Sequence, residues 1–355
     1  MKEDLAMKRK KLTRGVVLAI ACCAVFIFTL ATNTSAAEKV LSCTTYSVGS
    51  TGYATSMGLF EAVAQTTDIK VRVVPAGTDT SKILPLREKM MDLSLFTGGG
   101  QYFAVEGKGD FADWGPQPLR LIFGCPEGAV AGMMVRGNSG IKTLADLKGR
   151  RVTLIPGSPA CEGLHAGYMA FGGLTWDDVK VVQMSSWGTA WKSVIEGSSD
   201  TAHCLVNSSV AFELASSPHG IHWLPAPAED KEGWERMHKH SPYLYPYKAT
   251  TGAGASQENP AIVASYYYGL VSYPYFDEET AYKLTKAIWN GYDIYSPKHP
   301  SLKLWTQDGA LMTDRFLSPY HPGSVKYFKE IGVWTKKHEE RQQALLDAEK
   351  ARIKK

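Results

Sequence analysis

The sequence has no short motif that marks a nucleotide-dependent enzyme or a serine hydrolase. It contains no P-loop, no Rossmann glycine fingerprint, no Gly-x-Ser-x-Gly elbow and no paired carboxylates. A Cys-x-x-Cys pair, an internal repeat and a low-complexity segment are also missing. We therefore expect a protein that is not an enzyme, with no catalytic residue, no metal and no cofactor.

The chain also carries little excess of either charge. The net charge is +4, and six basic side chains lie within the first 14 positions. The rest of the chain is close to neutral, so no electrostatic case exists for nucleic acid as a partner. A hydrophobic content of 44% and a charged content of 21% are typical of a globular protein, and 355 residues predict two domains.

Only one stretch is long and apolar. Gly15–Leu30 follows the basic residues and precedes small residues, which is typical of a secretory signal peptide cleaved near Ala36 or Ala37. An uncleaved anchor and lipidation at Cys22 or Cys23 are the alternatives. We expect an exported, soluble protein in a bacterial periplasm.

Few cysteines and histidines remain after this segment. An oxidising compartment permits disulfides among the four cysteines, and their pairing is open. Cys161 and Cys204 are the pair to test, and buried free thiols are the equal alternative. The closely spaced histidines are expected to be solvated loop residues: His219, His222, His238 and His240.

Strand and helix patterns alternate in two separate stretches of the chain, which predicts a mostly parallel α/β sheet. In the first stretch we expect strands at 39–48, 70–75 and 92–96, and helices at 54–65 and 82–89. In the second stretch we expect strands at 151–155, 179–184 and 202–206. We also expect helices at 144–147 and 187–196, a helix that begins at 162 and a helix that ends near 217. Apolar strands at 119–123 and 130–135 are expected to lead between two lobes, and 221–224 to lead back.

Small residues follow four of these strands. Gly49-Ser50-Thr51-Gly52, the segment 76–81, Thr97-Gly98 and Gly157-Ser158 each stand at a strand's carboxyl end. Ligands of such sheets lie beyond these ends, and helix N-termini favour anions. Ser and Thr are also ordinary N-caps, but four such loops favour a shared anion site.

The order of these segments resembles the TAXI family, the extracytoplasmic solute receptors of tripartite ATP-independent periplasmic (TRAP) transporters. The resemblance covers nearly all of the chain after the signal peptide and rests on motifs in sequence order. These are Gly49-Ser50-Thr51-Gly52, the segments 76–81, 91–95, 144–157, 188–202 and 219–225, Tyr245-Pro246-Tyr247 and the helix at 278–287.

The resemblance implies a two-lobed α/β type II periplasmic-binding-protein fold, with the ligand cleft between lobes joined by crossover strands. The implied domains are a signal peptide (1–37), lobe 1 (38–127 plus 225–335), lobe 2 (128–224) and a charged, solvated C-terminal helix (336–355). The implied function is capture of a small organic anion (a carboxylate, 2-oxo acid, amino acid or sulfonate) for TRAP permease subunits. A monomer is expected.

The same resemblance implies the ligand-binding residues: Ser50, Thr51, Gly52, Tyr53, Thr80, Ser81, Thr97, Gly98, Ser158, Ala160, Cys161, Trp187, Asn207 and Ser208. Trp191 is placed near the cleft, and Lys82 is preferred to Arg87 as an assisting cation. This chain departs from the family at 53–56 and at 159–162, where hydroxyl donors are replaced and a carboxylate is added. A glutamate-like ligand is therefore less favoured.

Two other functions stay open. A ligand-sensing subunit for a membrane kinase would use the same fold. A thiol-dependent enzyme would use Cys161 or Ser158 as nucleophile at a helix start, with His165 or His203 as base.

Overall fold

The computed structural model describes residues 39–353, and residues 40–355 form one compact unit. The predicted signal peptide lies outside the described residues. Within the described part, every helix is too short or too polar to cross a membrane.

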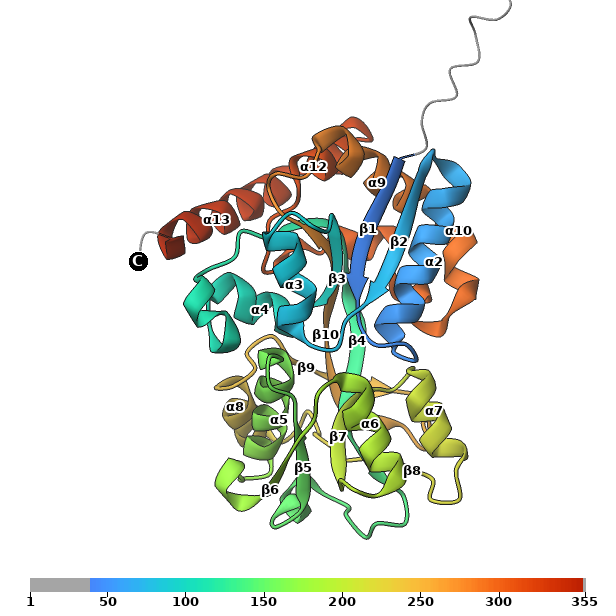
Figure 1. Ribbon diagram of the computed structural model, residues 1–355, viewed down its shortest axis with the longest axis vertical. Coiled ribbons are helices and arrows are strands. Elements are labelled where there is room, and N and C mark those ends of the chain that lie inside the picture. The colour runs from blue at the N-terminus through green and yellow to red at the C-terminus, as the bar shows by residue number, and fades with distance from the viewer. Residues whose placement is uncertain (1–38, 354–355) are drawn as a thin grey trace, which may run out of the picture. The chain divides into compact units, whose positions relative to one another are not determined.

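One mixed sheet of ten strands forms the centre of this unit (Figure 1). Its main path has the order β2-β1-β3-β10-β4-β7-β5-β6, with β8 beside β4 and β9 beside β10. The strands are β1 (Lys39–Thr45), β2 (Ile69–Pro75), β3 (Leu93–Thr97), β4 (Arg120–Arg136), β5 (Arg151–Leu154), β6 (Lys180–Gln183), β7 (Thr201–Leu205), β8 (Ile221–Trp223), β9 (Tyr245–Ala249) and β10 (Ala261–Ser272). We call the β2-β1-β3 side the first lobe and the β7-β5-β6 side the second lobe.

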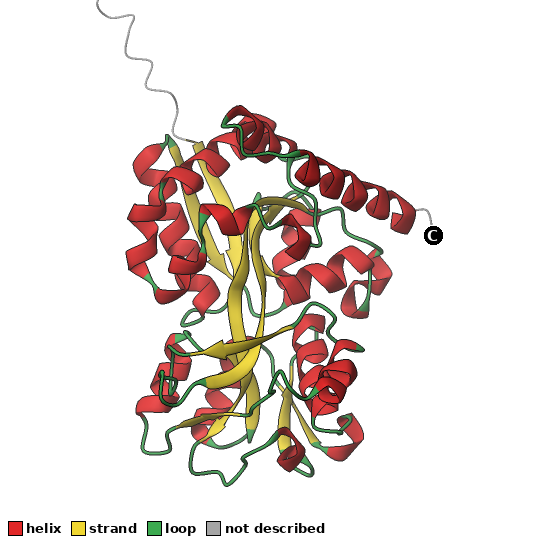
Figure 2. Cartoon of the chain, turned by 180° about the vertical axis from the view of Figure 1, so that it is seen from behind, coloured by secondary structure: helices red, strands yellow, loops and turns green. Residues whose placement is uncertain are grey.

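Two long antiparallel strands run through both lobes. β4 has 17 residues and β10 has 12, and they pair from Ala264–Ala131 to Ser272–Arg120. β10 also pairs with β3 of the first lobe, and β4 with β7 of the second. Figures 1 and 2 both show these two strands as the sheet connection between the lobes.

Helices cover both halves of the sheet (Figure 2). Those of the second lobe are α5 (Pro159–Phe171), α6 (Trp187–Glu196), α7 (Ser209–Ser216) and α8 (Lys231–His238). The remaining helices of four or more residues are α2 (Thr51–Thr66), α3 (Asp79–Arg87), α4 (Gly98–Glu106), α9 (Glu278–Asn290), α10 (Tyr292–Tyr295), α11 (Gln307–Ala310), α12 (Pro322–Glu330), α13 (Lys336–Ile353) and the 3-10 helices η1 (Gly109–Trp114), η2 (Leu144–Leu147) and η5 (Pro300–Leu304). The predicted alternation of strands and helices is confirmed, and α6 has the predicted bounds.

One continuous strand replaces the two that the sequence predicts around residue 125. Cys125 pairs with Tyr268 and Ala129 with Tyr266, so three residues of β4 stand opposite one of β10. This irregularity accommodates Pro126, which has no N–H to give to a ladder. The predicted break is therefore a bulge inside β4.

The chain returns to the first lobe later than the sequence indicates. After β8, α8 packs against α5 and buries Trp234 and Met237. Arg236 donates to the carbonyls of Ala170 and Phe171, at the end of α5. Residues after 224 thus stay with the second lobe, and β10 carries the chain back.

The C-terminal helix α13 is attached to the first lobe along one face. Arg120 of β4 donates to both carboxylate oxygens of Glu349, at 2.6 and 2.9 Å. Gln342 exchanges hydrogen bonds with the backbone of Tyr320, and Leu345 is buried. The expectation of a merely solvated helix holds for the outer face only.

Candidate ligand-binding site

The predicted loops lie at the N-termini of helices that face each other between the lobes. Their hydroxyls cap these helices: Ser50 accepts from the N–H of Tyr53, and Thr97 from that of Gly100. Capping satisfies N–H groups that a helix leaves without a partner. Three of the four loops thus have the N-cap role, through Ser50, Thr78 and Thr97, whereas Ser158 makes no side-chain capping bond. A ligand would use other groups as well.

Several predicted residues bind the opposite lobe directly. Thr51 and Ser208 share a hydrogen bond of 3.0 Å between their hydroxyls. The N–H of Thr80 donates to the carbonyl of Gly157 at 3.0 Å, and the N–H of Asp79 donates to the hydroxyl of Ser158 at 3.1 Å. The lobes are closed on one another at these points.

A small enclosed cavity remains between the two lobes. Its volume of about 10 Å³ has room for about one water molecule. Its lining residues come from both lobes and from β10: Tyr46, Ser50, Thr97, Ala160, Leu164, Trp187, Trp191, His203, Leu205, Tyr266 and Tyr268. Four predicted site residues are among them: Ser50, Thr97, Ala160 and Trp187.

Aromatic rings form most of the cavity wall. The Tyr46 ring lies 5.8 Å from those of Trp187 and Tyr268, both edge-on. Trp191 lies 6.5 Å from Trp187 between ring centroids, and its indole N–H donates to the carbonyl of His203. Trp191 therefore both lines the cavity and packs its helix onto the sheet.

Gly52 permits this close packing. A Cβ atom there would lie 2.7 Å from the Tyr268 hydroxyl and 2.7 Å from a ring carbon of Tyr46. Both distances are shorter than real Cβ contacts. Gly52 thus contributes through its lack of a side chain.

Five predicted residues do not line the cavity and make no contact between the lobes described above. Tyr53 is half-buried, and Ser81 is exposed and closes the capping box of α3 with Thr78. Gly98 lies under the ring of Tyr267. Asn207 is half-buried beside Gly252. Cys161 lies behind the cavity wall, as described below.

The sequence interpretation missed the tyrosines of the wall. Tyr46 directly follows β1, and Tyr266 and Tyr268 lie on β10, inside a stretch for which the sequence predicts only the completion of the first lobe. The run Tyr266-Tyr267-Tyr268 was the available signal. In a strand, alternate residues of such a run point to the same face.

The preferred cation, Lys82, is already paired. Its Nζ lies 3.3 Å from the Asp79 carboxylate and 3.0 Å from the centre of the Tyr46 ring, and both charged side chains are fully buried. Burial lowers the pKa of Lys82 to about 7 and raises the pKa of Asp79. Asp79 also accepts from the N–H of Ala160, so the pair lies at the contact between lobes. Arg87 lies 5.3 Å from the Trp114 ring.

Cys161 stands beside both histidines of the enzyme alternative. Its sulfur lies 3.3 Å from Nδ1 of His165 and 3.8 Å from Nδ1 of His203, and all three residues are buried. Burial raises the pKa of the Cys161 thiol well above its ordinary value. A neutral thiol is a poor nucleophile, so the helix dipole does not activate it here.

The four cysteines of the described chain are all buried free thiols, so Cys161 and Cys204 do not form the disulfide weighed above. Cys161, His165 and His203 are a group of possible metal ligands, with ligand atoms within 4.8 Å of one another. Two of the histidines expected in loops lie in regular elements: His222 is in β8 and contacts the carbonyl of Lys142, and His238 ends α8 and contacts that of Leu244.

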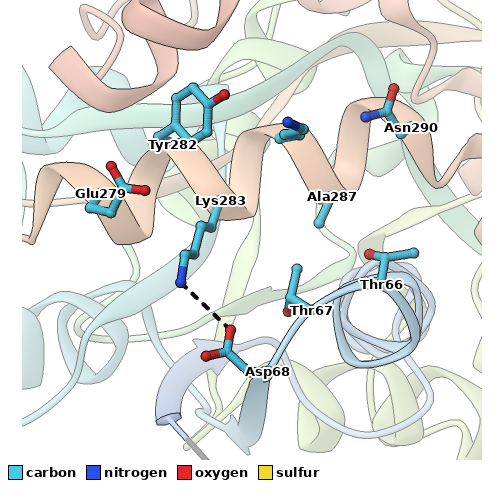
Figure 3. A pocket seen from close by; sticks show the side chains of 9 residues that line it. Thr66, Thr67, Asp68, Glu279, Tyr282, Lys283, Ala287 and Asn290 are labelled. Carbon is cyan, nitrogen blue, oxygen red and sulfur yellow. Dashed lines mark ion pairs between the residues drawn. The ribbon is translucent and has the colours of Figure 1, made fainter. Parts of the chain in front are cut away.

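A second hollow lies on the outer surface of the first lobe, between the end of α2 and the helix α9 (Figure 3). It has a volume of about 380 Å³, and Lys283 forms an ion pair with Asp68 across it. None of the predicted site residues lines it. Its open, charged surface contrasts with the enclosed aromatic cavity between the lobes.

Comparison with known proteins places the chain in a family. Residues 43–332 match the NMT1-like family, so the chain belongs to that family. The mixed α/β fold with a central sheet, expected from the sequence, is the fold that the structure has. This match does not extend to the narrower assignment to the TAXI family.

Several solved structures are similar to this chain at low identity. A protein of Bordetella bronchiseptica RB50 is 15% identical, with a TM-score of 0.50 over 88% of this chain and 89% of the other. The alkanesulfonate-binding protein SsuA of Xanthomonas axonopodis pv. citri, bound to MOPS, is 15% identical, with a TM-score of 0.45 over 88% and 85%. The periplasmic aliphatic sulphonate binding protein SsuA of Escherichia coli is 16% identical, with a TM-score of 0.43 over 86% and 91%.

Proposed function

We propose that the protein is an exported solute receptor that closes its two lobes on one small organic anion in the periplasm. The observation that carries this proposal is the enclosed cavity at the carboxyl ends of strands from both lobes. Ligands of open α/β sheets bind at such ends. The family match and the shared fold support the same function.

The closed cavity has room for about one water molecule, so the lobes must separate slightly to admit a solute, and the lining then favours a compact anion bound by neutral donors. Hydroxyl groups of Tyr, Ser and Thr and the N–H of Trp187 surround the cavity, while Asp79 balances the charge of Lys82. Each hydrogen bond to an ionised group contributes about 1.5–3 kcal/mol. A carboxylate, 2-oxo acid, amino acid or sulfonate would suit this lining. The two SsuA proteins are named as sulfonate-binding proteins.

The test is thermal unfolding of the purified protein with organic acids, amino acids and sulfonates. A ligand at 100 times its dissociation constant adds about 2.7 kcal/mol to the free energy of unfolding. Tyr268→Phe in the cavity should weaken the response, and Lys286→Ala in the outer hollow should leave it unchanged. No shift with any compound would contradict the proposal, and chemically altered ligand on recovery would indicate an enzyme.

Delivery to a TRAP permease is a further part of the proposal and rests on the TAXI resemblance. A TRAP permease is driven by an ion gradient. By contrast, two proteins of similar structure, an SsuA protein of Methylobacillus flagellatus KT and an amino acid-binding protein, are named as parts of ABC transporters, which use ATP. Uptake of the identified solute should therefore stop with an ionophore and persist when ATP is depleted. The opposite pattern would assign the receptor to an ATP-driven permease.

A further inference from the structure

Hydrogen bonds around Cys161 constrain the protons of two buried histidines. The backbone N–H of His203 donates to Nε2 of His165 at 3.1 Å. A backbone N–H can only donate, so Nε2 of His165 carries no proton. The single proton of the neutral ring is therefore on Nδ1, which faces Cys161.

The thiol proton then has one acceptor among the ring nitrogens beside it. The sulfur of Cys161 contacts Nδ1 of His165, which is protonated, and Nδ1 of His203 at 3.8 Å. A thiol is a weak donor with one proton, and an unprotonated ring nitrogen accepts it. We take the thiol as the donor in the 3.8 Å contact with His203, which places the proton of that ring on Nε2.

His203 also lines the cavity, beside a second N–H donor. Its ring lies edge-on to Trp187, with 5.0 Å between ring centroids, and both residues line the cavity. The indole nitrogen of Trp187 is buried and has no hydrogen-bond partner among the described residues. A buried donor without a partner costs about 1–3 kcal/mol, which a ligand acceptor would recover.

We propose that His203 is the specificity-determining residue of the second lobe, presenting Nε2–H beside the Trp187 N–H to the oxyanion group of the solute. Cys161 and His165 are positioning residues that fix the proton of His203. This inference rests on the proposed function and names the part of the ligand that the second lobe recognises. An oxyanion accepts two such donors, whereas an ammonium group has no acceptor to offer them.

Burial supports the neutral form of both rings. Desolvation lowers the pKa of His165 to about 3 and holds the pKa of His203 well below its ordinary value. A metal ion bound by Nδ1 of His165 would require the ring proton on Nε2, opposite the N–H of His203. The three side chains are thus arranged as a hydrogen-bond relay, although their spacing is also that of metal ligands.

The first experiment is NMR of the purified protein labelled with ¹⁵N-histidine, using long-range proton–nitrogen spectra to determine each tautomer. We expect His165 protonated on Nδ1 and His203 on Nε2, with Cys161→Ala changing the tautomer of His203 but not that of His165, which the backbone N–H of His203 still fixes. His203 protonated on Nδ1 would overturn the inference. A cobalt–thiolate absorption band after addition of Co²⁺ would overturn it in favour of a metal site.

The second experiment compares His203→Gln with His203→Asn, using pyruvate and ethanesulfonate as probes and propionamide as the uncharged control. A Gln amide nitrogen can stand where Nε2 stood, whereas that of Asn lies nearer Nδ1. We expect Asn to weaken binding of the probe anions by about 10- to 150-fold and Gln to retain most of it. Equal affinity of both variants and the wild type would overturn the inference.

The two experiments separate this inference from the proposed function. The expected tautomers with no binding of any acid would contradict the receptor function. A solute that binds His203→Asn as well as the wild type would be consistent with the receptor function and would refute the role of His203.

Discussion

His165 and His203 are ionisable side chains held inside a well-packed lobe. Both are buried, and burial lowers the pKa of each ring. Between the ordinary pKa of 6.5 and the folded value of about 3, the unfolded chain binds a proton at His165 that the folded chain excludes. The free energy of unfolding therefore falls as the pH is lowered through this window.

Replacing His165 should flatten this dependence. His165→Gln keeps an acceptor for the His203 N–H but has no titrating group, so the slope should drop by up to about 1.4 kcal/mol per pH unit. Urea unfolding at pH 7, 6, 5 and 4 measures it. The exposed His240→Gln is the matched control, and a slope equal to that of the wild type in His165→Gln would contradict the prediction.

At the scale of elements, the helix N-termini of the two lobes meet through short hydrogen bonds. Thr51 begins α2 and Ser208 directly precedes α7, and their hydroxyls lie 3.0 Å apart. The backbone N–H of Trp187, at the start of α6, donates to the carbonyl of Gly77. Such bonds form only when the lobes are closed, so they stabilise the closed form selectively.

Ser208→Ala should weaken solute binding without unfolding the protein. Loss of one hydrogen bond costs the closed form about 1 kcal/mol, which corresponds to roughly fivefold weaker binding. Calorimetry with the identified solute measures the affinity. The neighbouring Ser209→Ala, which is exposed, is the control, and equal loss in both variants would refute a specific role for Ser208.

The attachment of α13 depends on one well-shielded ion pair. The side chains of Arg120 and Glu349 are 11% and 16% exposed, whereas the pair Lys336–Glu340 on the same helix is 92% and 66% exposed. Glu349→Gln should lower the free energy of unfolding by about 1–3 kcal/mol, and Glu340→Gln by less than about 0.5. Denaturant unfolding distinguishes them, and equal effects would contradict the buried pair's importance.

At the scale of the whole described chain, β4 and β10 are the continuous connections between the lobes. Their pairing is irregular between Tyr266 and Tyr268, beside the cavity. A closing motion needs a few residues that absorb backbone change, and an irregular ladder offers them. We infer that the lobes close about this part of the two strands.

Solute should therefore make the molecule more compact. Small-angle X-ray scattering of the wild type should show a smaller radius of gyration with the identified solute than without it. Ser208→Ala should show a larger radius than the wild type at subsaturating solute, because its closed form is less stable. An unchanged radius in all samples would mean that binding does not involve closure.

The sequence by itself determined the alternation of strands and helices and the small residues at the strand ends. Local signals carry these features: the period of apolar residues, N-capping hydroxyls and glycine at turns. The helix over 187–196 was predictable to the residue because Ser186 and Gly197 both mark its ends.

Only the tertiary structure decided which side chains face the cavity. Tyr268 comes from a strand more than 200 positions after Tyr46, yet their rings lie 5.8 Å apart. Thr51 and Ser208 were expected to contact ligand but bond each other, because closure brings two helix starts together. Pairing between distant segments, the charge balance of Lys82 and the relay at Cys161 depend on packing, which no local pattern encodes.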